Sequence, residues 1–226
     1  MLRAIAEAER TLLDAEARRS YDGGLHPQDG GGLDSAEYKF PGGAISAKLI
    51  DGRPLVDVDV VVAASKVTSL QTLLPFFDTM MSKKRSLLLV VPDVDDEVVA
   101  TFIVNHTREI AQMVVVVAPG FGRNKEGLLR DLSVVVGAED RSAGFSNRGA
   151  AEEFTSFWIG HAAQATVADT EVVITHGAGS RRNVESYFRE LVDGTPESGT
   201  TDPVDWLGAP GLRDRIARIE RYLQSA

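Results

Sequence analysis

The chain has 226 residues and a formal net charge of −9, from 24 lysines and arginines against 33 aspartates and glutamates. Its length suits one large domain or two small ones, and the acidic balance argues against general nucleic-acid affinity, which needs a concentrated basic face. The absence of cysteine excludes disulfides and thiolate catalysis, and no apolar run approaches the roughly 20 residues that span a membrane. The N-terminus lacks the pattern of a signal peptide, so a cytoplasmic location is expected.

The first 35 residues are predicted to form a helix and a flexible linker. Apolar residues recur at helical spacing from Leu2 to about Arg19. Glycines and a proline then follow up to about Ser35, which favours a linker. Residues 12–22 also faintly resemble the last helix of a J-domain, although the His-Pro-Asp loop that precedes that helix in J-domains is missing.

Strands and helices are predicted to alternate in the next part of the chain. From about residue 44 the pattern changes to strands, expected at 55–63, 87–91 and 113–117, with helices at 67–82 and 96–109 between them. Such an alternation with short connections is typical of a parallel sheet with right-handed crossovers. The sequence therefore predicts an α/β fold.

The remainder of the chain is predicted to add helices and one hairpin. Helices are expected at 125–133, around 150–158, from the glycine-rich turn at 177–180 to about 192, and at 212–223. A β-hairpin is expected at 165–175, with its turn at Asp169-Thr170. Residues 194–210, rich in Gly, Pro, Ser and Thr, are predicted to form a loop.

Motifs for cofactors and catalysis are incomplete. The glycines at 120–125 lack the spacing of a P-loop, those at 177–179 lack the third glycine of a dinucleotide fingerprint, and 144–149 is one residue too long for a nucleophile elbow. The four histidines form no spaced metal pair, and the acidic run at 93–97 fits the start of a helix better than a calcium loop. We therefore expect no cofactor, no metal and no enzymatic activity.

The helices predicted at 67–82 and 96–109 carry apolar residues on more than one face. A helix that packs on one side of a sheet needs only one apolar stripe. The surplus residues either pack elsewhere in the chain or leave a hydrophobic groove exposed, and exposed apolar patches usually mark binding sites. The pattern alone leaves both possibilities open.

Four short motifs occur in a specific order along this part of the chain. They are residues 73–77 (LLPFF), 93–94 (DV), 100–105 (ATFIVN) and, most specific of all, 117–122 (VAPGFG). Together they resemble the apical domain of the group I chaperonins, the GroEL family, and the similarity covers roughly residues 45 to 223. The resemblance implies a swivelling β/β/α apical fold at 36–193, preceded by the segment 1–35 and followed at 194–226 by a helix that resembles part of the family's intermediate domain.

The resemblance also implies a binding groove between two helices, which takes non-native polypeptide and the lid co-chaperonin. Carried over by position, its residues are Leu74, Phe77, Val99, Ile103 and Val104, with Asn105 at the edge. The family's Gly-Asp-Gly-Thr-Thr phosphate loop has no counterpart here, so ATPase activity is not implied. The aromatic segment beneath the family's groove could be replaced only by Tyr38 and Phe40.

These observations lead to three hypotheses of different classes. The leading one is ATP-independent, chaperone-like binding of non-native or amphipathic polypeptide segments in the groove. The alternative is an adaptor for one dedicated partner, such as a chaperonin or its lid. The third is an enzyme on the same α/β scaffold, and only the incomplete glycine-loop motifs support it. We expect polypeptides as partners, and we expect no binding to nucleic acid or to a membrane.

Overall fold

The structure is a computed structural model that describes residues 33, 36–44, 54–140, 157–193 and 203–225. The helix and linker predicted in the first 35 residues lie outside the described residues, apart from Leu33. Contacts divide the chain into the units Met1–Gly31 and Gly32–Ala226, and the second contains the fold described below.

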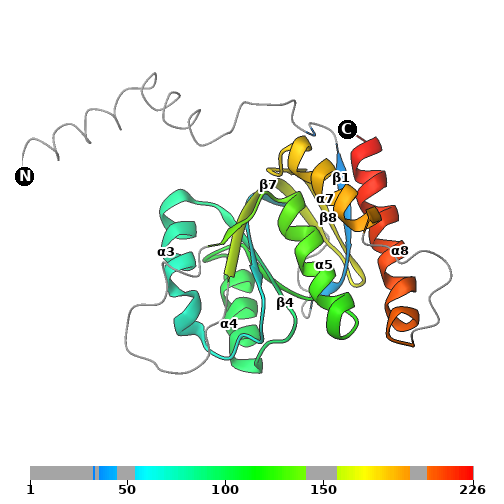
Figure 1. Ribbon diagram of the computed structural model, residues 1–226. Helices are drawn as coiled ribbons and strands as arrows, with labels where there is room; N and C mark the ends of the chain where they lie inside the picture. Colours follow the sequence, from blue (N-terminus) through cyan, green and yellow to red (C-terminus); the bar gives the residue numbers. More distant parts are fainter. Residues whose placement is uncertain (1–32, 34–35, 45–53, 141–156, 194–202, 226) are drawn as a thin grey trace, which may run out of the picture. The chain divides into compact units, whose positions relative to one another are not determined.

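A mixed sheet of eight strands forms the centre of the described part (Figure 1). The order is β1-β8-β7-β3-β4-β5-β2, and the short β6 pairs with β7. Strands β3, β4 and β5 are parallel, and the other pairs are antiparallel. Their bounds are β1 Glu37–Pro41, β2 Gly43–Ala44, β3 Leu55–Ala63, β4 Ser86–Val91, β5 Met113–Val117, β6 Glu139–Asp140, β7 Phe157–Val167 and β8 Glu171–Gly177.

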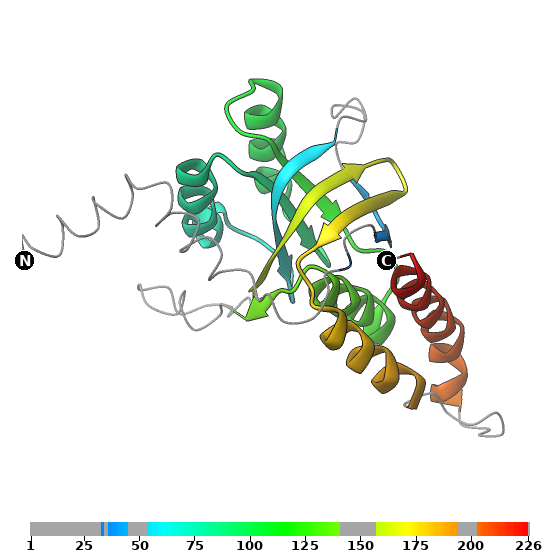
Figure 2. The same cartoon turned by 90° about the horizontal axis from the view of Figure 1, so that it is seen from above.

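Helices cover both faces of this sheet (Figures 1 and 2). On one face lie α3 and α4, and on the other lie α5, α7 and α8. A short 3-10 turn, η2, leads into α3. The bounds are η2 Leu70–Leu73, α3 Leu74–Lys83, α4 Asp96–Thr107, α5 Gly122–Val135, α7 Arg181–Asp193 and α8 Pro203–Gln224. Among the described helices, none combines the length and apolar character that crossing a bilayer requires.

The core has two layers because successive side chains of a strand point to opposite faces of the sheet. In β4, Leu88 and Val90 belong to the layer with α5, α7 and α8. Leu87 and Leu89 belong to the layer with α3 and α4. Strands that are buried on both sides need apolar residues at every position, which explains the nearly continuous apolar runs of β3, β4 and β5.

The strand predictions are confirmed for the centre of the sheet. Strands β3 and β5 have the predicted bounds, and β4 begins one residue early, at Ser86. The predicted hairpin is formed by β7 and β8, both longer than expected. Strand β1 was not predicted, because the strand pattern was expected to begin only at about residue 44.

The helix predicted at 67–82 begins later in the structure. Val67 forms a parallel bridge with Val94 instead. Ser69 then starts η2, where its side-chain oxygen accepts the N–H of Gln71 at 3.2 Å. Helix α3 begins at Leu74 with Pro75 in its first turn, a position where the missing proline N–H removes no helical hydrogen bond.

Two further predictions are wrong in part. Phe157 and Trp158, expected at the end of a helix, begin β7, where they pair with Ala63 and Val62 of the buried β3. The rest of that predicted helix lies outside the described residues. Helix α8 starts at Pro203, within the segment predicted to be a loop. Its glycine and prolines suggested a loop, but packing against other elements can override such propensities.

A buried ion pair joins the three helices on one face of the sheet. Asp131 of α5 is 0% exposed and accepts hydrogen bonds from Arg215 of α8, at 2.9 Å from Nε and 2.7 Å from Nη2. The hydroxyl of Tyr187 on α7 also donates to Asp131, at 2.6 Å. Burial raises the pKa of Tyr187 and the Asp131 carboxylate raises it further, so the hydroxyl remains a donor.

We expect the Arg215→Met variant to lower the free energy of unfolding by about 3–5 kcal/mol, because it leaves a buried carboxylate without its cation. Urea denaturation measures this effect. The matched control is Arg213→Met, an exposed arginine on the same helix, expected to change stability by less than about 0.5 kcal/mol. Equal effects of the two substitutions would show that the ion pair does not hold the helices together.

Candidate functional site

Helices α3 and α4 lie on the same face of the sheet and touch through an aromatic contact (Figure 1). The rings of Phe77 on α3 and Phe102 on α4 have centroids 5.7 Å apart and are tilted by 60°. Phe76 and Met80 of α3 are buried against the sheet with Val98 of α4. The inner faces of both helices therefore belong to the core, and their outer faces form the candidate binding surface.

The six residues predicted for the groove all lie on these two helices, but they differ in exposure. Leu74 is 52% exposed and Val104 is 43% exposed. Phe77, Ile103 and Asn105 are partly buried, whereas Val99 is buried at 8% exposure. Val99 therefore supports the core beneath the surface and offers little area to a partner.

Asn105 shapes the end of α4. Its side-chain Nδ2 donates to the carbonyl oxygen of Thr101 at 2.8 Å, one turn earlier in the helix. Its own carbonyl accepts the N–H of Ile110 at 3.0 Å in the turn that follows α4. The contacts described for this residue are thus local ones that position the chain after the helix.

Two further apolar residues belong to this region but were not among the predicted groove residues. Met81, near the end of α3, is 53% exposed, and Ile110, just after α4, is 55% exposed. Met81 lies within, and Ile110 directly after, the two predicted helices whose sequences carry a surplus of apolar residues. The sequence did not show which members of the surplus turn outward, since that depends on how each helix is rotated on the sheet. We call Leu74, Met81, Val104 and Ile110 the outer apolar set.

The aromatic residues considered as substitutes beneath the groove lie elsewhere. Tyr38 and Phe40 are both fully buried, in the core layer that contains α5 and α8. Helices α3 and α4 cover the opposite layer. The expectation that Tyr38 and Phe40 could underlie the groove is therefore wrong. Their side chains both point to the face of the sheet that α5 and α8 cover, away from α3 and α4.

The acidic residues before α4 place negative charge at the start of the helix, as predicted. Asp96 and Glu97 lie in its first turn, where they interact favourably with the helix dipole. Asp95, the residue that precedes the helix, makes no capping hydrogen bond with its side chain. It pairs instead with Lys66 at 2.7 Å. Within the described ranges, no group of His, Asp and Glu residues is arranged to hold a metal ion.

The glycines of the motifs that the structure describes allow backbone conformations and close backbone contacts that other residues would not. Gly120, in the turn before α5, and Gly122, the first residue of α5, adopt positive φ angles of 84° and 52°, a conformation that glycine adopts without strain. Gly179 lies so close to the end of α5 that a Cβ atom would collide with the carbonyl oxygen of Val134. The motif at 144–149 lies outside the described residues.

A second cluster of charged side chains lies near the start of β3. His161 of β7 contacts Asp57 through Nε2 at 3.2 Å and approaches Asp59 through Nδ1 at 3.5 Å. Arg85 donates to Asp59 at 3.0 Å. Burial by itself would raise the pKa of Asp59, but His161 and the Arg85 guanidinium together outweigh it, so the pKa lies below its usual value. The charged groups of the cluster are paired with one another, which suits a structural role, although the buried Nδ1 of His161 makes no hydrogen bond within the described residues.

Comparison with known proteins shows that part of this chain is similar in sequence to a chaperonin. No known family model matches it. The chain is 31% identical over 168 residues to the mitochondrial chaperonin HSP60 of Trypanosoma cruzi. The match covers 73% of this chain and 29% of that relative, so the chain spans under a third of the length of the curated relative it matches. The chain contains a chaperonin-related region.

The cluster around Asp59 leads to a prediction about acid stability. Since folding lowers the pKa of Asp59, its ionised form contributes stability above about pH 4, near the unfolded pKa, and that contribution disappears as the pH falls through the folded pKa. In the Asp59→Asn variant this contribution is absent. We therefore expect the free energy of unfolding to fall less steeply with pH below about pH 4 than in the wild type.

Urea denaturation at a series of acidic pH values measures this slope. Asp214→Asn, at an exposed position of α8, is the matched control and should keep the wild-type slope. Parallel curves for the wild type and Asp59→Asn would contradict the assignment of the acid-sensitive interaction to Asp59.

Proposed function

We propose that this chain binds non-native or amphipathic polypeptide segments on the outer surface of α3 and α4, without ATP and without catalysis. The similarity to a mitochondrial chaperonin supports a chaperone-type function at the level of the family. The mixed α/β sheet with helices on both faces is compatible with a chaperonin-like domain. An apical-type fold over residues 36–193 is part of the proposal.

The observation that carries the proposal is the concentration of exposed apolar side chains on this face. Within the described residues, seven large apolar side chains are exposed, and the four members of the outer apolar set are among them. The other three lie on separate elements: Val56 on β3, Phe121 before α5 and Val192 on α7. Three members of the outer apolar set lie on α3 and α4 and Ile110 follows α4 closely, and exposed apolar surface of this kind usually marks a binding site.

The physics of such a surface explains why no nucleotide is needed. Burying one side chain such as Leu or Ile contributes about 1.5–3 kcal/mol, and the ordering of a flexible segment opposes it. Burial of a few such residues therefore gives micromolar affinity without any chemical step. Because apolar burial is non-directional, it distinguishes poorly among sequences, which suits a protein with many clients.

One observation favours the alternative, an adaptor for a dedicated partner such as a chaperonin or its lid. Neither Tyr38 nor Phe40 lies under α3 and α4, and Val99 is buried. One predicted groove residue and both aromatic residues considered beneath the groove are therefore absent from this surface. The cytoplasmic location and the lack of enzymatic activity stay predictions.

We expect the double variant Leu74→Glu/Val104→Glu to bind a labelled amphipathic peptide at least about tenfold more weakly than the wild type, because charges replace two exposed apolar side chains that the bound peptide would bury. Fluorescence anisotropy measures the dissociation constant of the peptide. Adding ATP should leave this constant unchanged. The matched control is Val56→Glu/Val192→Glu, at positions 62% and 43% exposed on other elements. Circular dichroism checks that both variants fold.

A panel of unrelated amphipathic peptides separates the two candidate functions. Similar affinities across the panel support chaperone-like binding. If the wild type binds none of them, or if the control variant loses as much affinity as the α3/α4 variant, the proposal fails, and a pull-down with a chaperonin and its lid then tests the adaptor.

A further inference from the structure

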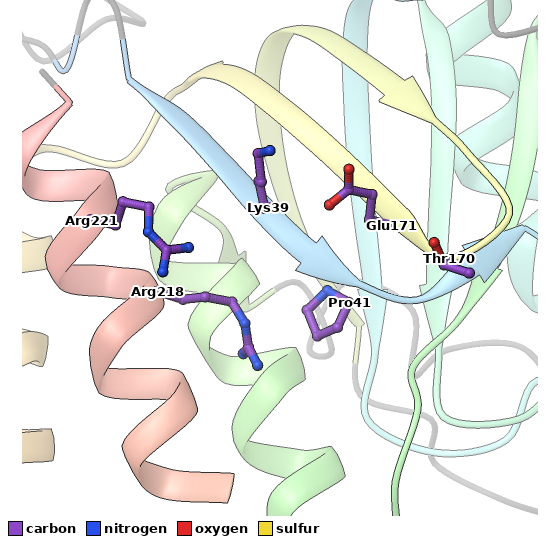
Figure 3. A pocket seen from close by; sticks show the side chains of 6 residues that line it. All are labelled: Lys39, Pro41, Thr170, Glu171, Arg218 and Arg221. Carbon is purple, nitrogen blue, oxygen red and sulfur yellow. The ribbon is translucent and has the colours of Figure 1, made fainter.

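A cavity of about 250 Å³ lies between β1, the turn that joins β7 to β8, and α8. Arg218 and Arg221 project from α8 toward β1, as Figure 3 shows. The lining residues are Lys39, Pro41, Thr170, Glu171, Arg218 and Arg221. Since α8 packs on the layer opposite to α3 and α4, this cavity is separate from the proposed polypeptide surface.

The lining is strongly basic although the chain as a whole is acidic. Three cationic side chains and one carboxylate give it a net charge of +2, whereas the chain carries −9. Among the described residues, no carboxylate oxygen lies within 4.0 Å of the charged groups of Lys39, Arg218 or Arg221. Elsewhere in the described part, arginines such as Arg85 and Arg215 are paired with aspartates. Within the part of the chain that the structure describes, the three cations of this cavity therefore have no ion-pair partner.

Arg218 is the most informative member of the set. Its Nη1 atom is buried and has no hydrogen-bond partner among the described residues. A buried donor without an acceptor is unfavourable and rare in native proteins. The nearby Tyr38 hydroxyl does not supply a negative charge, because burial raises the pKa of Tyr38 and Asp131 raises it further, while Arg218 only partly opposes this. Within the described residues, no side chain supplies this acceptor.

We propose that this cavity binds a small phosphate monoester that also carries a hydroxyl group. A phosphate monoester has a charge of about −1.5 to −2 at pH 7, which matches the excess positive charge of the lining, whereas a single carboxylate would leave half of it unbalanced. Arginine forks and lysine are the usual phosphate ligands in proteins. The hydroxyl of Thr170 adds a further donor.

Glu171 and the size of the cavity define the rest of the ligand. A carboxylate beside a phosphate site is repulsive unless it accepts a hydrogen bond, and a hydroxyl group on the ligand supplies that donor. The volume lies below the roughly 300–1,000 Å³ of most ligand pockets, and no aromatic residue is among those that line it. A compact polyol phosphate fits these features better than a nucleotide, whose base needs more space and an apolar or aromatic wall.

The test uses the full chain and glycerol 3-phosphate as the probe, with isothermal titration calorimetry at low ionic strength. We expect saturable binding, weaker binding of inorganic phosphate, and none of glycerol. Arg218→Gln and Lys39→Gln should each raise the dissociation constant at least about tenfold, as expected for loss of a charge-assisted hydrogen bond. The matched control is Arg213→Gln, an exposed arginine of α8 outside the cavity, which should bind like the wild type.

Glu171→Gln tests the hydroxyl contact separately. It removes a negative charge, so inorganic phosphate should bind more tightly, while the preference for glycerol 3-phosphate should shrink. Equal weakening by Arg213→Gln and Arg218→Gln, or no saturable binding to the wild type, would overturn the proposal. Tighter binding of a phosphoserine peptide than of glycerol 3-phosphate would overturn the assignment to a small ester. None of these outcomes depends on whether α3 and α4 bind polypeptide.

Discussion

The burial of both faces of the three parallel strands is the constraint on which the rest of the structure depends. Every residue from Leu87 to Val91 in β4 is at most 1% exposed. A strand of this kind has no solvent side, so helices must cover the sheet on both faces. The chain supplies α3 and α4 for one face and α5, α7 and α8 for the other. Each candidate site is then defined by what these helices leave uncovered.

The outer surfaces of the two helical layers differ in chemical character. On one side, the Asp131–Arg215 ion pair joins α5 to α8, Tyr187 joins α7 to both, and the surface beyond them includes a basic cavity. On the other side, α3 and α4 meet through the rings of Phe77 and Phe102, and the residues beyond that contact are apolar. A buried ion pair fixes geometry, whereas an apolar surface gains most from burial by a partner. The proposed sites follow this division.

The sequence predicts the elements of this fold better than it predicts exposure. Continuous apolar runs locate β4 and β5 because burial on both faces leaves no other pattern, whereas β3 begins with alternating valines and aspartates and becomes continuously apolar only in its second half. In contrast, Val99 and Val104 lie on the same predicted helix and resemble one another chemically, yet one is 8% exposed and the other 43%. That difference depends on the rotation of α4 on the sheet. The basic cavity joins Lys39, Glu171 and Arg218, which only the tertiary fold brings together.

The contact between Phe77 and Phe102 also bears on how selective the proposed polypeptide surface is. Because these rings pack against each other, a partner at this point meets the outer edges of both helices, where Leu74 and Val104 are exposed. The side-chain amide of Asn105 donates one hydrogen bond within its own helix, which fixes its orientation at the edge of the surface. Recognition then depends on apolar area more than on hydrogen-bond geometry. Such recognition gives weak, broad binding, which agrees better with many clients than with one dedicated partner.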